Sequence, residues 1–392
     1  MNTTFLHTAD WQLGKPFARV DDEQKRVLLQ QERLNVLDRI GEAARTHKAE
    51  FVVVAGDLFD SASATKSCVS AACSGIGRLG VPVLVIPGNH DHGGPGGIWE
   101  QKFFLEEARQ LAPNLRLLLK AEPVEIDNAV VFPCPLLRRH EASDPTAWLR
   151  TVLPDAAKFG GKPRIVLAHG SVQGFSAESG DDEADGSGVP NLIDLGRLPE
   201  PELDYVALGD WHGTKQVGAK AWYAGTPELD RFVKGGEHNP GNVLAVTAKR
   251  GELPEVTTIR TFRFAWSELP FSLTNDAELE QLEAALNQSV GLQPGQSLLR
   301  LDLRGSLGLE ASARLDALLE KWRARLVRLK LNNATVIAPS EAEIHALTQR
   351  AGDPLISRVA ARLVQQASGT SEDAAAAQLA LRQLHAATIQ SC

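Results

Sequence analysis

The chain has 392 residues, of which 43% are hydrophobic and 23% charged, a composition typical of a folded globular protein with one large and one or two smaller domains. Its formal net charge of −8 gives no overall basic signal for nucleic acid, although a local basic face can still hold phosphates. No run approaches the roughly 18 apolar residues that span a membrane, and no signal segment opens the chain. The cysteines lack a C-x-x-C pair, which favours free thiols and a cytoplasmic protein.

The first 265 residues alternate short apolar runs with amphipathic segments. The runs predict buried strands at Thr3–Thr8, Phe51–Ala55, Val81–Ile86, Ile165–Ala168 and Tyr205–Leu208. The segments Gln24–Lys48, Thr65–Leu79 and Trp99–Leu111 predict helices. In the first of these, the apolar face is expected to carry Val27, Leu34, Leu37, Ile40 and Ala44. The alternation predicts an α/β fold with a buried sheet.

The pattern changes near residue 265, and residues 266–340 are expected to form a small second α/β domain. Leu298–Leu303 predicts a strand and Glu310–Leu329 a helix. Basic side chains are concentrated on and just after this helix, at Arg314, Lys321, Arg323, Arg325, Arg328 and Lys330. They form either a charged solvent face or a surface that faces DNA.

Residues 341–392 are expected to form a helical tail. Asp353 and Pro354 predict a helix start, and a second helix is expected from near Thr370. Both helices carry apolar stripes. The stripes either fold back on the second domain or bind a partner.

Five polar motifs follow the predicted strands of the first domain. They are Asp10-Trp-Gln12, Gly56-Asp57-Leu-Phe-Asp60, Gly88-Asn89-His90-Asp91, His169-Gly170 and Gly209-Asp210-Trp-His212-Gly213. Loops at the carboxyl ends of strands are where open α/β sheets hold their sites. Carboxylate, amide and imidazole ligands together suit manganese, iron, magnesium or zinc, and two such ions can clamp a phosphate. Each motif alone is weak evidence, but their joint placement predicts a metal centre.

The order of these motifs resembles the calcineurin-like metallophosphoesterases. The opening Phe5–Gly14 and the later Tyr223-Ala-Gly-Thr-Pro227 look more specifically like the SbcD-type DNA exonucleases. The resemblance covers about residues 1–265. It implies a four-layer metallophosphoesterase β-sandwich flanked by helices in residues 1–265, a capping or DNA-binding domain in 266–340, and a tail, 341–392, that binds a partner.

The resemblance also implies roles for individual residues. Two divalent ions, manganese or alternatively magnesium, are implied. Asp10, Gln12, Asp57 and His212 would hold the first ion. Asn89, His169 and Asp210 would hold the second, with Asp57 bridging the two. His90 would act on the leaving oxygen, oriented by Asp60.

Two ligand positions depart from the family pattern. Gln12 stands where the family usually has histidine, and so does Asp210. Both offer oxygen, so an active enzyme with a harder metal site is favoured over a weakened one.

The function implied by resemblance is metal-dependent hydrolysis of DNA as an exonuclease, and as an endonuclease on single strands, in DNA repair. Its implied partners are DNA and an SbcC-type coiled-coil ATPase, with a homodimer as a further assembly. Two alternatives stay open. One is a phosphodiesterase or phosphatase for small nucleotides, and the other is a catalytically weakened DNA-binding scaffold.

Overall fold

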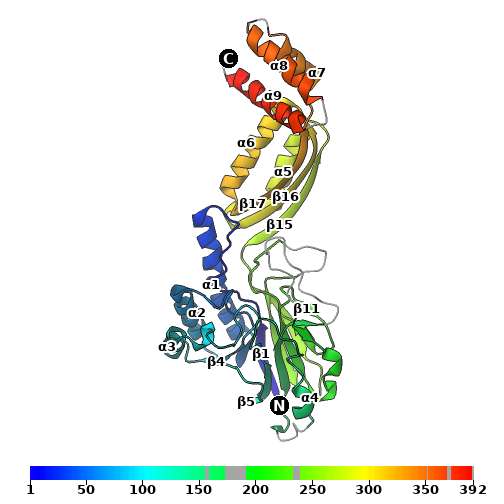
Figure 1. Ribbon diagram of the computed structural model, residues 1–392. Helices are drawn as coiled ribbons and strands as arrows, with labels where there is room; N and C mark the ends of the chain where they lie inside the picture. Colours follow the sequence, from blue (N-terminus) through cyan, green and yellow to red (C-terminus); the bar gives the residue numbers. More distant parts are fainter. Residues whose placement is uncertain (155–158, 173–190, 233–238, 351, 369–371, 391–392) are drawn as a thin grey trace. The chain divides into compact units, whose positions relative to one another are not determined.

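The computed structural model describes residues 1–154, 159–172, 191–232, 239–350, 352–368 and 372–390. The chain divides into two compact units, Met1–Arg263 and Phe264–Cys392 (Figure 1). The segments expected as a capping domain and as a tail fall together in the second unit. Each unit is described by itself.

Unit 1 contains two six-stranded sheets (Figure 1). The first has the order β14 (Glu255–Arg260), β13 (Asn242–Lys249), β1 (Asn2–Thr8), β2 (Phe51–Ala55), β3 (Val83–Ile86) and β4 (Leu115–Leu117). The second has the order β11 (Lys215–Gln216), β12 (Ala221–Tyr223), β10 (Tyr205–Gly209), β7 (Arg164–His169), β6 (Ala129–Cys134) and β5 (Val124–Ile126). Strands β1 to β4 are parallel, and so are β6, β7, β10 and β12. A two-stranded pair, β8 (Ser171–Val172) and β9 (Leu192–Ile193), lies beside them.

Three hydrophobic clusters separate the layers of unit 1. One packs the first sheet against α1 (Glu23–Thr46), α2 (Lys66–Arg78) and α3 (Lys102–Leu111). A second lies between the sheets, where Phe5 and Val53 meet Ile165 and Tyr205. The third covers the outer face of the second sheet with α4 (Leu149–Val152) and short 3-10 turns at Leu195–Arg197 and Glu200–Glu202. The predicted four-layer α/β sandwich is therefore confirmed.

The local signals in unit 1 explain its elements. The β-branched run Phe51–Ala55 is buried along its whole length, as expected for a central parallel strand. Helix α1 begins where the Asp22 side chain accepts a hydrogen bond from the Lys25 amide. Val27 was wrongly assigned to the apolar face, because its side chain is 53% exposed. The helix predicted from Trp99 starts at Lys102, after a 3-10 turn.

Unit 2 contains a parallel sheet of β15 (Ala265–Leu273), β16 (Ser297–Leu307) and β17 (Arg328–Ile337). Helices α5 (Glu278–Val290) and α6 (Leu309–Arg325) connect these strands, and a 3-10 turn at Pro294–Gln296 precedes β16. Alternate leucines of β16 pack against both helices in one cluster. The predicted helix 310–329 was too long at its end, because Leu326 is extended (φ −75°, ψ 152°). Arg328 and Lys330 therefore belong to β17, where polar and apolar residues alternate.

Three helices follow the sheet: α7 (Glu341–Thr348), α8 (Pro354–Ala367) and α9 (Glu372–Gln390). The start predicted for α8 is confirmed, since the Asp353 side chain accepts from the Ile356 amide. The start expected near Thr370 lies outside the described residues. One buried residue from each of four helices forms a small core: Leu309, Leu347, Ala360 and Leu381. In the part of the chain that the structure describes, no helix is long and apolar enough to cross a membrane.

Candidate metal centre

The predicted ligands lie in loops at the carboxyl ends of β1, β2, β3, β7 and β10. The loops are joined by main-chain hydrogen bonds, from the Asp10 amide to Gly56 O (3.1 Å) and from the Gln12 amide to Asp57 O (2.9 Å). The Asp210 amide donates to the Asp10 carboxylate at 3.2 Å, which connects the two sheets. Parallel strands in both sheets thus bring these side chains to one edge of the sandwich.

Three predicted ligands converge around the Nε2 atom of His169, and Asp10 lies in the same cluster. Asn89 Oδ1 lies 2.8 Å from it, Asp57 Oδ2 lies 3.5 Å away and Asp210 Oδ1 lies 3.8 Å away. One ligand atom each from Asp10, Asp57 and His169 lies within 4.8 Å of the others. All three of these residues are buried. This donor set, three carboxylates with an amide oxygen and an imidazole, fits a divalent cation.

The ring of His169 is oriented for metal binding. Its Nδ1 lies 2.8 Å from the carbonyl oxygen of Ala55, so Nδ1 carries a proton and donates. Burial lowers the pKa of His169, but Asp57, Asp10 and Asp210 outweigh it and raise this pKa to about 9. Burial raises the pKa of Asp10, and the neighbouring carboxylates raise it further. The cluster therefore has an excess of buried negative charge that a cation would neutralise.

The backbone at the predicted ligands is strained. Four of them have a left-handed conformation: Asp10 (φ 52°), Gln12 (φ 42°), Asp57 (φ 54°) and Asp210 (φ 101°). Among the described residues other than glycine, only Phe17 and Lys48 share this feature. Such residues cost about 1–3 kcal/mol each and are concentrated at functional sites.

Close packing beside the cluster requires glycine at position 88. A Cβ atom there would stand 2.1 Å from Asp57 Oδ1 and 2.6 Å from the Asp57 amide nitrogen. The Gly-Asn-His-Asp motif thus lets the loop after β3 approach the carboxylate that follows β2.

His90 lies beside the cluster. Its amide donates to Asp57 Oδ1 at 2.9 Å, and its Nε2 lies 4.0 Å from Asp57 Oδ2. Its Nδ1 lies 2.8 Å from the main-chain oxygen of Asp60. The sequence suggested that Asp60 orients this ring. The contact found is with the Asp60 main chain, whereas its carboxylate lies 3.5 Å from Lys15 Nζ.

Gln12 and His212 have a different environment from His169. Gln12 Oε1 accepts from Lys15 Nζ at 3.0 Å, and Gln12 Nε2 lies 3.4 Å from His212 Nε2. His212 Nδ1 lies 3.2 Å from Asp230 Oδ2 and 3.1 Å from Arg231 Nη2. These two predicted ligands thus contact the charged side chains of Lys15, Asp230 and Arg231.

Several residues that build the site were not assigned a role from the sequence. Arg33 of α1 is 1% exposed and donates to the carbonyl oxygens of Asp10 and Trp11. The sequence feature that could have identified Arg33 is its position as a charged residue on the helix face that carries Leu37 and Ile40. Asp91 accepts from the amides at positions 59 and 88 and so closes the loop after β3. Burial raises the pKa of Asp91 to about 7.

The sandwich and this cluster together define a metal-binding phosphoester hydrolase. The sequence model of the family described as Calcineurin-like phosphoesterase matches residues 3–214, more than half of the chain. The chain belongs to that family.

The chain is also similar to the D subunit of the nuclease SbcCD from Escherichia coli, in strain K12 and in strain O157:H7. Each is 25% identical over 293 residues, which cover 65% of this chain and 67% of the relative. A solved structure, TT1561 of Thermus thermophilus, matches 66% of this chain and 100% of its own, with 14% identity and a TM-score of 0.39.

Proposed function

We propose that this chain is a metal-dependent phosphodiesterase that hydrolyses DNA as an exonuclease, and single strands as an endonuclease, in DNA repair. The observation that carries the proposal is the convergence of Asp57, Asn89 and Asp210 on His169 Nε2, with His90 beside them. The similarity to one component of a bacterial nuclease supports DNA as the substrate.

The donor set supports manganese or magnesium as the bound ion. Carboxylate and amide oxygens outnumber imidazole nitrogen in the cluster, and hard oxygen donors favour these ions over zinc. When bound, the divalent ion supplies Lewis-acid chemistry to a phosphoryl oxygen. Asp10, Asp57, Asn89, His169 and Asp210 would hold it.

His90 is the residue proposed to act on the leaving oxygen. Its side chain is 17% exposed, so the ring is reachable from outside while its Nδ1 is held by a main-chain carbonyl. In the imidazolium form, Nε2 can donate a proton to an oxygen that leaves beside the cluster. Asp57 fixes this position because it accepts from the His90 amide.

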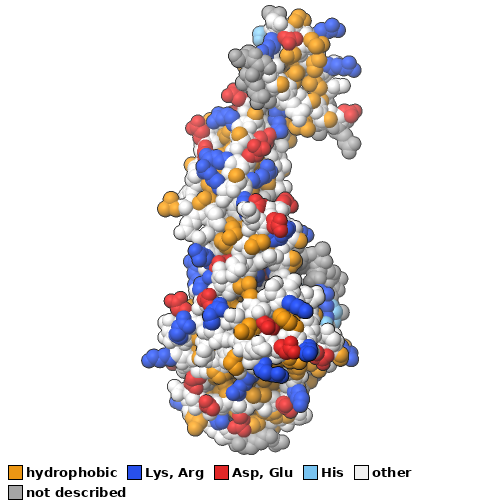
Figure 2. All heavy atoms as spheres, turned by 90° about the vertical axis from the view of Figure 1, so that its left-hand side faces the viewer, with side chains coloured by type: hydrophobic (Ala, Val, Ile, Leu, Met, Phe, Trp, Pro, Cys, Tyr) orange, Lys and Arg blue, Asp and Glu red, His pale blue; other side chains and the backbone are white. Residues whose placement is uncertain are grey.

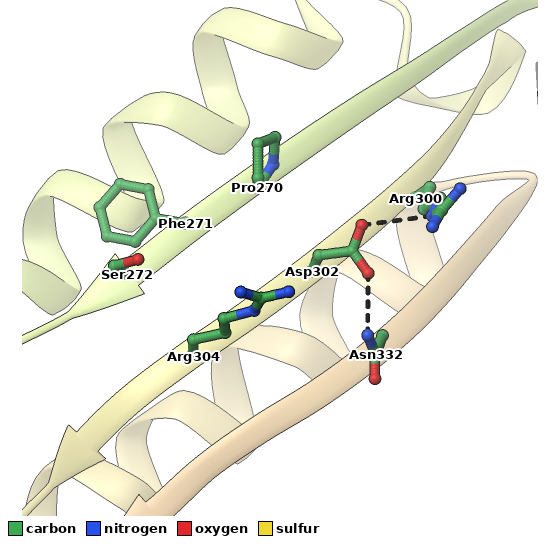
Figure 3. A pocket seen from close by; sticks show the side chains of 7 residues that line it. All are labelled: Pro270, Phe271, Ser272, Arg300, Asp302, Arg304 and Asn332. Carbon is green, nitrogen blue, oxygen red and sulfur yellow. Dashed lines mark hydrogen bonds and ion pairs between the residues drawn. The ribbon is translucent and has the colours of Figure 1, made fainter. Parts of the chain in front are cut away.

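Unit 2 offers a candidate contact for the DNA backbone. The sheet face opposite α5 and α6 is hollowed where strands β15, β16 and β17 meet (Figure 3). Arg300 lies 3.2 Å from Asp302, which also accepts from Asn332 at 3.1 Å, and Arg304 lines the same hollow (Figure 3). We propose that Arg304 contacts phosphate. On the face in Figure 2, basic and acidic side chains of unit 1 are interspersed, so phosphate binding would rest on local groups.

The partner proposed is an SbcC-type coiled-coil ATPase, bound through α8. Part of the apolar stripe of this helix is used inside unit 2, where Ala360 is buried with Leu381. Leu355 and Val359 of α8 are 70% and 41% exposed. An exposed apolar helix face fits docking along a coiled coil. We also propose that the protein is located in the cytoplasm.

A nuclease assay tests the proposal. The full chain is incubated with linear and circular DNA, both single- and double-stranded, with manganese or with a chelator. We expect metal-dependent loss of linear DNA, and a fall of about 10²–10⁴-fold in rate for His90→Ala with its metal retained. His47→Ala is the matched control, because His47 caps the end of α1. Hydrolysis of bis-p-nitrophenyl phosphate without any DNA cleavage would instead support a small-nucleotide phosphodiesterase.

One observation favours a second candidate, a DNA-binding subunit with a weakened site. Gln12 is hydrogen-bonded to Lys15 rather than open to an ion. This candidate predicts DNA binding by fluorescence anisotropy without hydrolysis, and no effect of His90→Ala on that binding.

A further inference from the structure

The two sides of the predicted two-ion centre have different surroundings. On one side, carboxylates surround His169. On the other side, the carbonyl oxygen of Gln12, which is the atom that would bind an ion, accepts a hydrogen bond from Lys15 Nζ at 3.0 Å. The amide nitrogen of Gln12 faces His212 Nε2 at 3.4 Å. Gln12, which departs from the family pattern, is therefore in direct contact with the ammonium group of Lys15.

Lys15 is held in this position by three oxygen atoms. Besides Gln12 Oε1, its Nζ lies 3.3 Å from Asp230 Oδ2 and 3.5 Å from Asp60 Oδ1. Its side chain is only 10% exposed. An ammonium group surrounded by two carboxylates and an amide oxygen has the partners that a small cation would take.

A second cation, the guanidinium group of Arg231, lies on the same side of the centre as Lys15. Arg231 Nη2 lies 3.0 Å from Asp230 Oδ2 and contacts the His212 ring, at 3.1 Å from Nδ1 and 3.5 Å from Nε2. His212 therefore lies between a guanidinium group and the Gln12 amide. Among the described His, Cys, Asp and Glu residues, the group whose ligand atoms all lie within 4.8 Å is Asp10, Asp57 and His169, without His212.

We propose that this chain binds one divalent ion, in the cluster around His169, and that the ammonium group of Lys15, supported by Arg231, takes the place of the second ion. Two fixed positive charges would repel another divalent cation at that position, and their carboxylate partners are already neutralised. The positive charge of the Lys15 ammonium group would attract a phosphate oxygen to that position. The inference rests on metal binding in the proposed site, and is independent of whether DNA is the substrate.

Metal counting tests the inference without an activity assay. The full chain is stripped with chelator, equilibrated with manganese and freed of excess ion, and its metal is measured by mass spectrometry. We expect about one manganese ion per chain, with the electron paramagnetic resonance spectrum of an isolated ion rather than of a coupled pair. About two ions per chain with a coupled spectrum would overturn the proposal.

Variants test the part played by Lys15. Lys15→Arg keeps a cation and should leave the count near one, whereas Lys15→Met combined with Gln12→His should raise it to about two. If the combined variant folds by circular dichroism and still binds one ion, Lys15 is not what excludes the second. Lys102→Met is the matched control, because the Lys102 side chain is 89% exposed on α3. If the combined variant does not fold, the wild-type count decides the question. A chain with one ion and no action on DNA would refute the proposed substrate alone.

Discussion

Arg33→Met should destabilise unit 1 strongly, although Arg33 is not one of the predicted metal ligands. The guanidinium group donates twice to the Trp11 carbonyl, at 2.9 and 2.5 Å, and once to each of the Asp10 (3.1 Å) and Glu228 (3.0 Å) carbonyls. The hydroxyl of Thr226 can donate to only one of the latter two at a time. The variant thus leaves the Trp11 carbonyl and one further acceptor without these donors in the interior. At about 1–3 kcal/mol for each of these two acceptors, the cost is about 2–6 kcal/mol.

Thermal unfolding followed by circular dichroism measures this cost. For a unit of this size, about 4 kcal/mol corresponds to a fall in Tm of about 10 °C. Arg45→Met, at an exposed position in the last turn of α1, should change the free energy of unfolding by less than about 0.5 kcal/mol. Manganese affinity should also fall in the Arg33 variant, because the Asp10 main chain loses an anchor. A loss of stability no larger than that of the Arg45 control would refute the reasoning.

Three further changes have definite expected outcomes. Gly88→Ala should displace the loop after β3 and lose its metal, since the new Cβ would stand 2.1 Å from a carboxylate oxygen of the cluster and 2.6 Å from the Asp57 amide nitrogen, whereas Gly161→Ala, with open space around it, should keep metal by mass spectrometry. Leu381→Ala should cost about 2–5 kcal/mol in chemical denaturation because the side chain is 1% exposed, whereas Leu379→Ala, 47% exposed, should cost less than about 0.5 kcal/mol. An ion must displace the proton of His169, whose metal-free pKa is about 9, so manganese affinity by titration calorimetry should rise about tenfold per pH unit between about pH 6 and 8. Since the pKa of His169 is raised above its usual value of 6.5, the metal-free protein should also lose stability as the pH rises from about 6.5 to 9. A manganese affinity that does not change with pH would contradict the first expectation, and an unfolding free energy that does not change over this range would contradict the second.

Much of unit 1 was predictable because its signals are local. The run Phe51–Ala55 identifies a central strand by itself, and Gly56-Asp57 directly after it identifies the loop that follows. The helix predicted over 310–329 was only partly right, because a stretch of alternating leucine and basic residues suits either a helix or a half-buried strand. Pairing with β16 selected the strand for Arg328 and the residues after it.

The environment of the candidate site was less predictable than its ligand positions. Sequence order gives the type of each ligand, but not which side chain turns toward it from another loop. Lys15 lies three residues after Gln12, while its partner Asp230 comes from more than 200 residues later. For the same reason, the family resemblance implied that Asp60 orients His90 but not through which atom, and the contact found is with the Asp60 main-chain oxygen.

The balance of charge across the site explains why these contacts matter for metal binding. On the His169 side, three carboxylates face one imidazole: Asp10, Asp57 and Asp210. On the Gln12 side, two carboxylates face two cations, namely Asp60 and Asp230 with Lys15 and Arg231. Buried carboxylates that lack a counter-charge take up protons or bind a metal ion, whereas paired carboxylates do neither. A chain built to hold two ions would leave acidic groups uncompensated on both sides. Among the described residues, the side that surrounds His169 is left in need of added positive charge, and the Gln12 side is not.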